Sequence, residues 1–141
     1  MSEATVHIAH RQINCTMMLK TPTGGHVEIH GQVATGFDVP CILDTGAMNA
    51  CINDQIMRQI GFKPIGTTHV GGANGSAVAN VYEAEIGIKG LTDFWVKGEV
   101  IGLPTRTALL GYNVFIHLDA IQINCKDLTV QFYYNDKMVT H

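Results

Sequence analysis

The sequence predicts an all-β fold, a small barrel or sandwich that carries one or two short helices. Short runs of β-branched and apolar residues recur at regular spacing, and glycine-containing turns separate them. Only two segments space their apolar residues as a helix does. The 141 residues match about one domain, and no internal repeat or linker divides them. We therefore expect a single domain over residues 1–141.

Three hairpins and one further strand make up the expected β structure. The first hairpin joins residues 27–33 to residues 39–43 across a loop that contains Gly36. The second hairpin is tipped by glycines, and the third closes the chain. The strands of these two hairpins, and the single strand between them, are expected at residues 67–70, 77–88, 94–100, 121–125 and 128–134.

Two helices are expected, one from strong capping signals and one from weaker ones. Apolar residues recur at helical spacing over residues 53–60, Asn53 is a good N-cap, and Gly61 suits the end of the helix. Asp54 lies in the first turn, where the helix dipole favours a negative charge. A second helix is expected at residues 114–118, capped by Asn113.

Composition excludes several classes of protein. Charged residues are 15% of the chain, against about 25% in an average soluble protein, and 9 Lys+Arg against 12 Asp+Glu give a net charge of −3. This excludes an electrostatic nucleic-acid binder, which needs a basic patch. We see no signal peptide, and the longest charge-free run, residues 64–82, is too polar to span a membrane. We expect a cytoplasmic protein whose charge-poor surface is partly covered by another subunit.

The cysteines and histidines give no pattern typical of a metal site. None of Cys15, Cys41, Cys51 and Cys125 sits in a C-x-x-C pair, so reduced thiols are expected. His26 and His30 would share one face of a strand, but no cysteine and no helical H-x-x-x-H context supports zinc. We expect no metal and no cofactor. A competing hypothesis is an unrelated small β-barrel that binds a ligand or a metal through its histidines.

One tripeptide, Asp44-Thr45-Gly46, concentrates the chemistry. It follows an uncharged strand, residues 39–43, where a carboxylate is costly to bury unless it is hydrogen-bonded, paired or functional. Gly46 lets the backbone approach the carboxylate so that its N–H can donate to it, and Ala47 leaves room above. The alternative is an Asx-type turn in which Asp44 merely ends the strand.

Together with two later segments, this tripeptide resembles the retropepsin-like aspartic proteases. Residues 42–47 resemble the family's apolar-apolar-Asp-Thr/Ser-Gly-Ala loop, and residues 109–115 resemble its apolar-apolar-Gly-x-Asn/Asp segment that leads into a helix. Between them, residues 71–75 match the family's glycine-tipped flap in type and order. The resemblance covers about residues 27–132. It implies a retropepsin-like closed β-barrel, the acid protease fold, assembled as a homodimer.

The chemistry implied by the resemblance needs two aspartates that share one proton across a water molecule, because like charges about 3 Å apart cannot both ionise. The ionised carboxylate activates the water, and the protonated one polarises the scissile carbonyl. The chain holds one Asp-Thr-Gly and is too short for two lobes. The resemblance therefore implies an Asp44 from each of two chains, paired across a two-fold axis.

Other residues take roles by the same resemblance. Thr45 would cross-link the two Asp44 loops, and the strand at Gly46 and Ala47 would bind an extended polypeptide substrate. Leu109, Leu110 and Gly111 would pack behind the loop as structural support. The flap that closes over the peptide would consist of Gly71, Gly72, Ala73, Asn74 and Gly75.

The sequence thus predicts a homodimeric aspartic endopeptidase with no nucleic-acid or membrane partner. The alternative is a catalytically inactive retropepsin-like module that dimerises or binds a peptide through the same groove. The intact loop at residues 44–47 favours the enzyme, since a binding module has no need of a costly carboxylate pair. Residues 1–25 match no motif, and a removed pro-segment, an interface strand and a disordered arm all stay open. A redox effect through Cys41 and Cys51, which flank the loop, is a further hypothesis.

Overall fold

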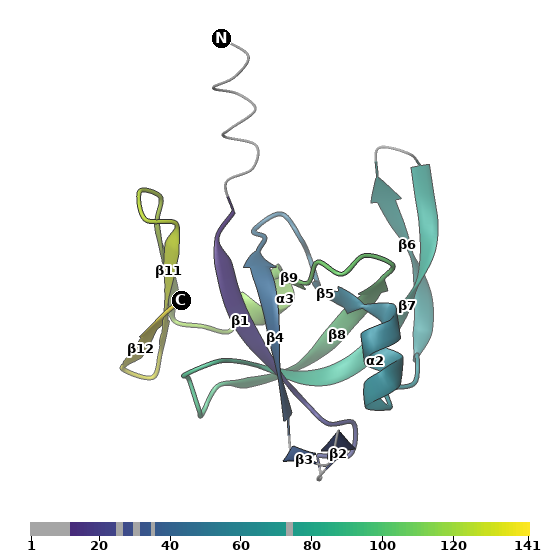
Figure 1. Ribbon diagram of the computed structural model, residues 1–141. Coiled ribbons are helices and arrows are strands. Elements are labelled where there is room, and N and C mark those ends of the chain that lie inside the picture. Colours follow the sequence, from purple (N-terminus) through teal and green to yellow (C-terminus); the bar gives the residue numbers. More distant parts are fainter. Residues whose placement is uncertain (1–11, 25–26, 30–31, 35, 73–74) are drawn as a thin grey trace.

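The computed structural model describes residues 12–24, 27–29, 32–34, 36–72 and 75–141. This part of the chain is mostly β, with two short helices, which confirms the expected class in its coarse form (Figure 1). None of its helices has the length and apolar character needed to cross a membrane.

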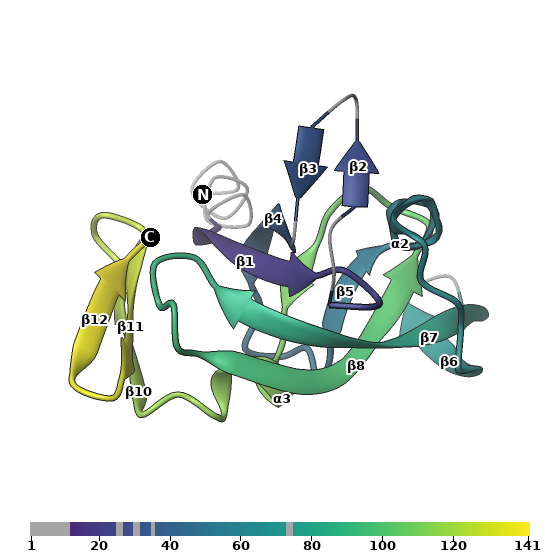
Figure 2. The same cartoon turned by 90° about the horizontal axis from the view of Figure 1, so that it is seen from below.

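Seven strands form the main sheet, in the order β1-β4-β9-β5-β8-β7-β6. Strand β1 also pairs with β7, so that the hydrogen-bonded pairings lead back to the first strand. Figure 2 shows β1, β7 and β8 side by side. The strands span β1 Asn14–Lys20, β4 Gly36–Leu43, β5 Ala50–Asn53, β6 Gly66–Gly72, β7 Gly75–Ile88, β8 Trp95–Leu103 and β9 Leu109–Leu110.

Two smaller sheets accompany the main one. Strands β2 (Val27–Ile29) and β3 (Gln32–Ala34) form a separate hairpin. Strands β10 (Ala120–Asn124), β11 (Thr129–Tyr134) and β12 (Lys137–Thr140) form a three-stranded sheet, which lies at the left in both views (Figures 1 and 2). The expected closing hairpin is therefore confirmed, and it gains a third strand.

The core divides into a large cluster and a small one. The large cluster includes Met17 and Leu19 of β1, which alternate with outward residues along the strand, and Phe132 of β11. The small cluster, Cys51, Ala79, Val81 and Ile101, joins β5, β7 and β8. Partly buried residues of β6 and β9 pack on the small cluster. The cluster therefore connects the β6–β7 hairpin, which contains the predicted flap, to β9.

The first helix agrees with its capping signals. Helix α2 (Asp54–Ile60) begins after Asn53, whose side chain accepts a hydrogen bond from the Ile56 N–H at 3.1 Å. It ends at Gly61, whose φ of 110° suits glycine and whose N–H donates to the Arg58 carbonyl in the last turn. The expected helix at residues 53–60 is thus confirmed.

The second helix differs from its prediction. Helix α3 (Tyr112–Phe115) starts two residues earlier than expected, and its N-cap is Gly111 rather than Asn113. The prediction that Asn113 caps a helix at residues 114–118 was wrong, because its side chain makes tertiary hydrogen bonds to two other strands.

The first expected hairpin was also wrong. Strand β4 pairs with β1 from Gly36 to Ile42, while residues 27–29 pair with residues 32–34. The reason is burial: β1 offers Cys15, Met17 and Leu19 on one face, and pairing with β4 places all three in the core. Residues 14–20 are consequently a strand of the chain's own main sheet. The second hairpin, β6 with β7, is confirmed with longer strands than expected.

Candidate active site

Asp44 follows directly on β4, at a strand end that is fixed from both sides. The Leu43 N–H donates to the Ile13 carbonyl at 2.9 Å, and the Asp44 N–H donates to the Leu110 carbonyl at 3.2 Å. Strand β9 runs parallel to β4, with Leu109 opposite Ile42 and Leu110 opposite Leu43. The backbone at Asp44 is therefore held between two neighbouring segments.

The Asp44 side chain is half-buried and accepts one hydrogen bond within the loop. The Gly46 N–H donates to Asp44 Oδ1 at 2.9 Å, and a Cβ at position 46 would lie 3.4 Å from the same oxygen. The Ala47 N–H donates to the Asp44 carbonyl at 3.2 Å. Within the described residues, Asp44 Oδ2 and the exposed Thr45 hydroxyl have no hydrogen-bond partner. The Gly46 N–H donates to the carboxylate as the functional interpretation expected, and the same hydrogen bond forms the Asx turn that the alternative expected.

The start of α3 holds the loop from behind. The Tyr112 N–H donates to the Ala47 carbonyl at 2.8 Å, and the Asn113 N–H donates to the Met48 carbonyl at 3.0 Å. Gly111 packs against this backbone so closely that a Cβ there would lie 2.4 Å from the carbonyl carbon and oxygen of Asn49.

The Asn113 side chain completes this support. Its Oδ1 accepts from the Ala50 N–H at 2.8 Å, and its Nδ2 donates to the Glu99 carbonyl at 2.9 Å. Asn113 thereby links β5 to β8 beneath the loop, a role that sequence reasoning missed. The available signal was its place in the Gly-x-Asn segment, which was interpreted as a cap.

A cleft of about 470 Å³ lies between the Asp44 loop and strand β6. Residues of the loop and of β6 line it, together with Cys51 and Ile101 of the small core cluster. Its lining contains no Asp or Glu among the described residues. The lining residues are Gly46, Ala47, Met48, Asn49, Cys51, Thr68, His69, Val70, Gly71, Ile101, Leu103 and Leu109.

The five predicted flap residues are only partly within the described structure. Gly71 lines the cleft, Gly72 ends β6, and Gly75 starts β7 with a φ of 99°. Ala73 and Asn74 lie outside the described residues. Figure 1 shows β6 and β7 standing away from the rest of the sheet, on the side to which β4 points.

Cys51, which lines the cleft, has a raised pKa. Burial, and secondarily the negative charge of Asp44, raise the pKa of the Cys51 thiol to about 11. A thiol with this pKa is not an activated nucleophile. The sulfurs of Cys15 and Cys41 lie 3.4 Å apart, and none of the four cysteines forms a disulfide. The redox hypothesis stays a prediction.

A metal centre has no support from this part of the structure. The described residues contain no cluster of three or more His, Cys, Asp or Glu side chains that could hold a metal ion. The histidines considered from the sequence, His26 and His30, lie outside the described residues.

Comparison with known proteins finds similarity among solved structures alone. No family model matches it, and no curated protein matches it. Among solved structures, it is similar to the solution structure of the simian foamy virus (mac) protease. The two share 18% sequence identity over 73% of this chain and 91% of that protease, with a TM-score of 0.47. A TM-score of this size does not equate two folds, so the function of this chain is inferred from its own residues.

Proposed function

We propose that this chain is a retropepsin-like aspartic endopeptidase that acts as a homodimer, with one Asp44 from each chain. The observation that carries the proposal is the Asp44 loop itself. One carboxylate oxygen is held by the Gly46 N–H, the other has no partner among the described residues, and the loop opens on a cleft beneath a β-hairpin. A turn that only ended a strand would need neither the cleft nor the support from α3.

The reaction needs two carboxyl groups in different protonation states. The ionised Asp44 takes a proton from water while the water oxygen attacks the scissile carbonyl carbon. The protonated Asp44 donates a hydrogen bond to the carbonyl oxygen, and a proton then passes to the leaving nitrogen as the C–N bond breaks. Among the described residues, no Asp or Glu lines the cleft beside Asp44, so in this proposal the second acid comes from a second copy.

An apolar surface beside the loop suits that second copy. Met48 is 70% exposed, Tyr112 at the start of α3 is 42% exposed, and Ile116, which follows α3, is 49% exposed. The Tyr112 backbone is hydrogen-bonded to the loop, so these side chains belong to the same region as Asp44. Covering them would remove apolar surface from water and would bring the two Asp44 loops together.

The flap strand offers a place for an extended peptide. Among the described residues, strand β6 lies at one end of the sheet order and has β7 as its one pairing partner, so its other edge is available. An extended peptide adds to such an edge through backbone hydrogen bonds, while alternate side chains enter pockets. We propose that the substrate binds in this way, between β6 and the Asp44 loop.

The proposal is tested by incubating an unstructured protein with the wild type, with Asp44→Asn and with Asp127→Asn as an exposed control. We expect cleavage by the wild type at mildly acid pH, a loss of about 10²–10⁴-fold for Asp44→Asn, and no loss for the control. Equal cleavage by Asp44→Asn would refute the role of Asp44. If the wild type binds a peptide but never cleaves, the chain is the inactive binding module instead.

Mixed dimers test whether the two chains share one site. The wild type and Asp44→Asn are unfolded together in equal amounts and refolded, and the activity is measured per total chain. If each site needs both carboxylates, about one quarter of the wild-type activity is expected, because only dimers of two wild-type chains are active. One half of the activity would show that each chain works alone.

A further inference from the structure

The β6–β7 hairpin leaves the rest of the sheet at one residue, Asn80. From Asn80 to Gly87, β7 is paired with β8, beginning with Asn80 opposite Gly102. Residues 75–79 of the same strand pair only with β6. The outer part of the hairpin is therefore a two-stranded ribbon, which is marginally stable by itself and depends on its base for its orientation.

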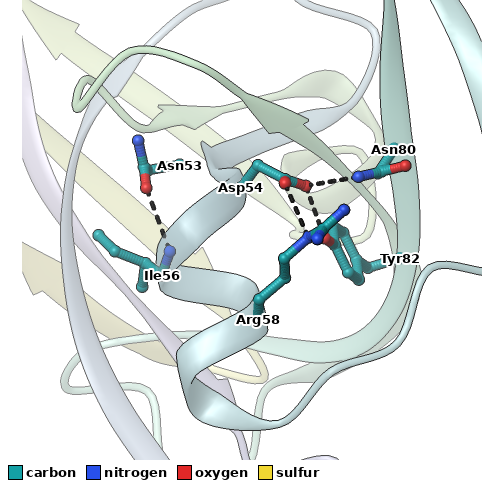
Figure 3. Close-up of polar contacts among 6 residues, drawn as sticks. All are labelled: Asn53, Asp54, Ile56, Arg58, Asn80 and Tyr82. Atoms are coloured by element: carbon teal, nitrogen blue, oxygen red, sulfur yellow. Dashed lines mark hydrogen bonds and ion pairs between the residues drawn. The ribbon is translucent and has the colours of Figure 1, made fainter.

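A polar cluster occupies this base. Asp54 Oδ1 accepts hydrogen bonds from the Tyr82 hydroxyl at 2.5 Å and from Asn80 Nδ2 at 3.1 Å. Asp54 Oδ2 lies 3.1 Å from Arg58 Nε, one helical turn along α2. Figure 3 shows the three partners converging on the one carboxylate, Asn80 and Tyr82 from β7 and Arg58 from the helix.

The surroundings of this carboxylate show that its position is specific. A Cβ at Gly102 would lie 2.4 Å from Asp54 Oδ1 and 3.0 Å from the Tyr82 ring, so glycine leaves the space that the carboxylate fills. The Tyr82 residue is fully buried, which fixes its hydroxyl. Partial burial acts to raise the pKa of Asp54, but the hydrogen bonds from Tyr82 and Asn80, with the charge of Arg58, hold that pKa below its ordinary value.

We infer that Asp54 is a positioning residue that anchors the base of the β6–β7 hairpin. Both of its oxygens have protein partners, and these contacts join α2 to the residue where the hairpin separates from β8. Since α2 follows the strand β5 that leads out of the Asp44 loop, the anchor fixes the hairpin relative to that loop. The consequence for a substrate rests on the proposed function, whereas the anchoring itself does not.

Hydrogen exchange of the backbone amides tests the anchor without any need for activity. The full chain is compared with Tyr82→Phe, which keeps the ring and removes only the hydroxyl, and with Asp54→Asn. The matched control is Glu83→Gln, which lies on β7 like Tyr82 and removes a surface ion pair with Lys97 of β8. We expect the amides of residues 66–71 and 75–79 to exchange at least tenfold faster in both anchor variants, and the amides of β4 and α3 to be unchanged.

The outcomes are distinct. Faster exchange throughout the chain would show that the cluster only adds global stability, and unchanged exchange in the hairpin would show that it anchors nothing; either result overturns the inference. Where peptide cleavage is measurable, Tyr82→Phe should raise KM more than it lowers kcat, because the chemical groups are intact. If no cleavage is found, the proposed function fails and the exchange result still decides the anchor.

Discussion

Replacing Gly111 by alanine tests how closely the backbone must pack behind the Asp44 loop. The added Cβ would lie 2.4 Å from the Asn49 carbonyl carbon and oxygen, and 2.9 Å from the Ala50 nitrogen. All three are backbone atoms, so they cannot rotate away as a side chain can. Gly111 has a φ of −103° and a ψ of 176°, an extended conformation that any residue adopts. The cost of the substitution is consequently steric and not conformational.

The magnitude follows from the contacts that must yield. Forcing a methyl group into a packed interior costs about 1–3 kcal/mol. Relief requires the loop to move away from α3, which weakens the hydrogen bonds from Tyr112 to Ala47 and from Asn113 to Met48, each worth about 0.5–1.5 kcal/mol. We expect Gly111→Ala to lower the free energy of unfolding by about 3 kcal/mol, and Tm by about 10 °C.

Urea and thermal unfolding, followed by circular dichroism, measure this effect against a matched variant. Gly66 lies at the start of β6 with no atom within 4 Å of an added Cβ, so Gly66→Ala should change stability by less than about 1 kcal/mol. Below its Tm, Gly111→Ala should also lose about 10²-fold in any Asp44-dependent cleavage, because the loop is displaced. If the two variants unfold at the same urea concentration, the close approach at Gly111 is refuted.

Two further predictions concern groups beneath and beside the loop. Asn113→Ala should lower the free energy of unfolding in urea by about 1–3 kcal/mol, since it leaves the Ala50 N–H and the Glu99 carbonyl without their partner. The exposed control Gln55→Ala should lower it little, and equal losses would contradict the role of Asn113. Iodoacetamide at pH 8 should label the exposed Cys125 rapidly and the three buried cysteines only after unfolding. Labelling of Cys51 should rise toward pH 11, because the pKa of its thiol is raised to about 11. Rapid labelling of a second cysteine at pH 8 would contradict this burial.

The elements that the sequence predicted well are those whose signals are local. Helix α2 has its cap, its apolar spacing and its terminating glycine within nine residues, from Asn53 to Gly61. The flap hairpin was predicted from a glycine-rich turn between two strand-like segments. The loop at Asp44 was predicted because a carboxylate after an apolar strand needs donors nearby, and Gly46 is two residues away.

The features that were missed depend on residues far apart in the chain. Strand β4 pairs with β1 because three inward residues of β1 complete the core, and no turn between the two strands announces that pairing. Asn113 is 63 positions from Ala50, whose N–H donates a hydrogen bond to the Asn113 Oδ1. Asp54 satisfies the local rule for the first turn of a helix, which concealed its contacts with Asn80 and Tyr82.

The proposed function requires a loop at Asp44 that is held from behind and has polar groups open in front. The loop backbone is held from behind by residues 110–113: the Asp44 N–H donates to the Leu110 carbonyl, the N–H groups of Tyr112 and Asn113 donate to the loop, and Gly111 packs against it. What lacks a partner in the described structure is one carboxylate oxygen and the Thr45 hydroxyl, the groups that a second Asp44 loop would face. A loop held rigidly from behind, with its polar groups open in front, is what a shared carboxylate pair requires, because the two acids must meet with little freedom to separate. The mixed-dimer measurement tests whether two Asp44 loops share one site, and Gly111→Ala tests the packing behind the loop. Either claim can therefore be refuted independently of the other.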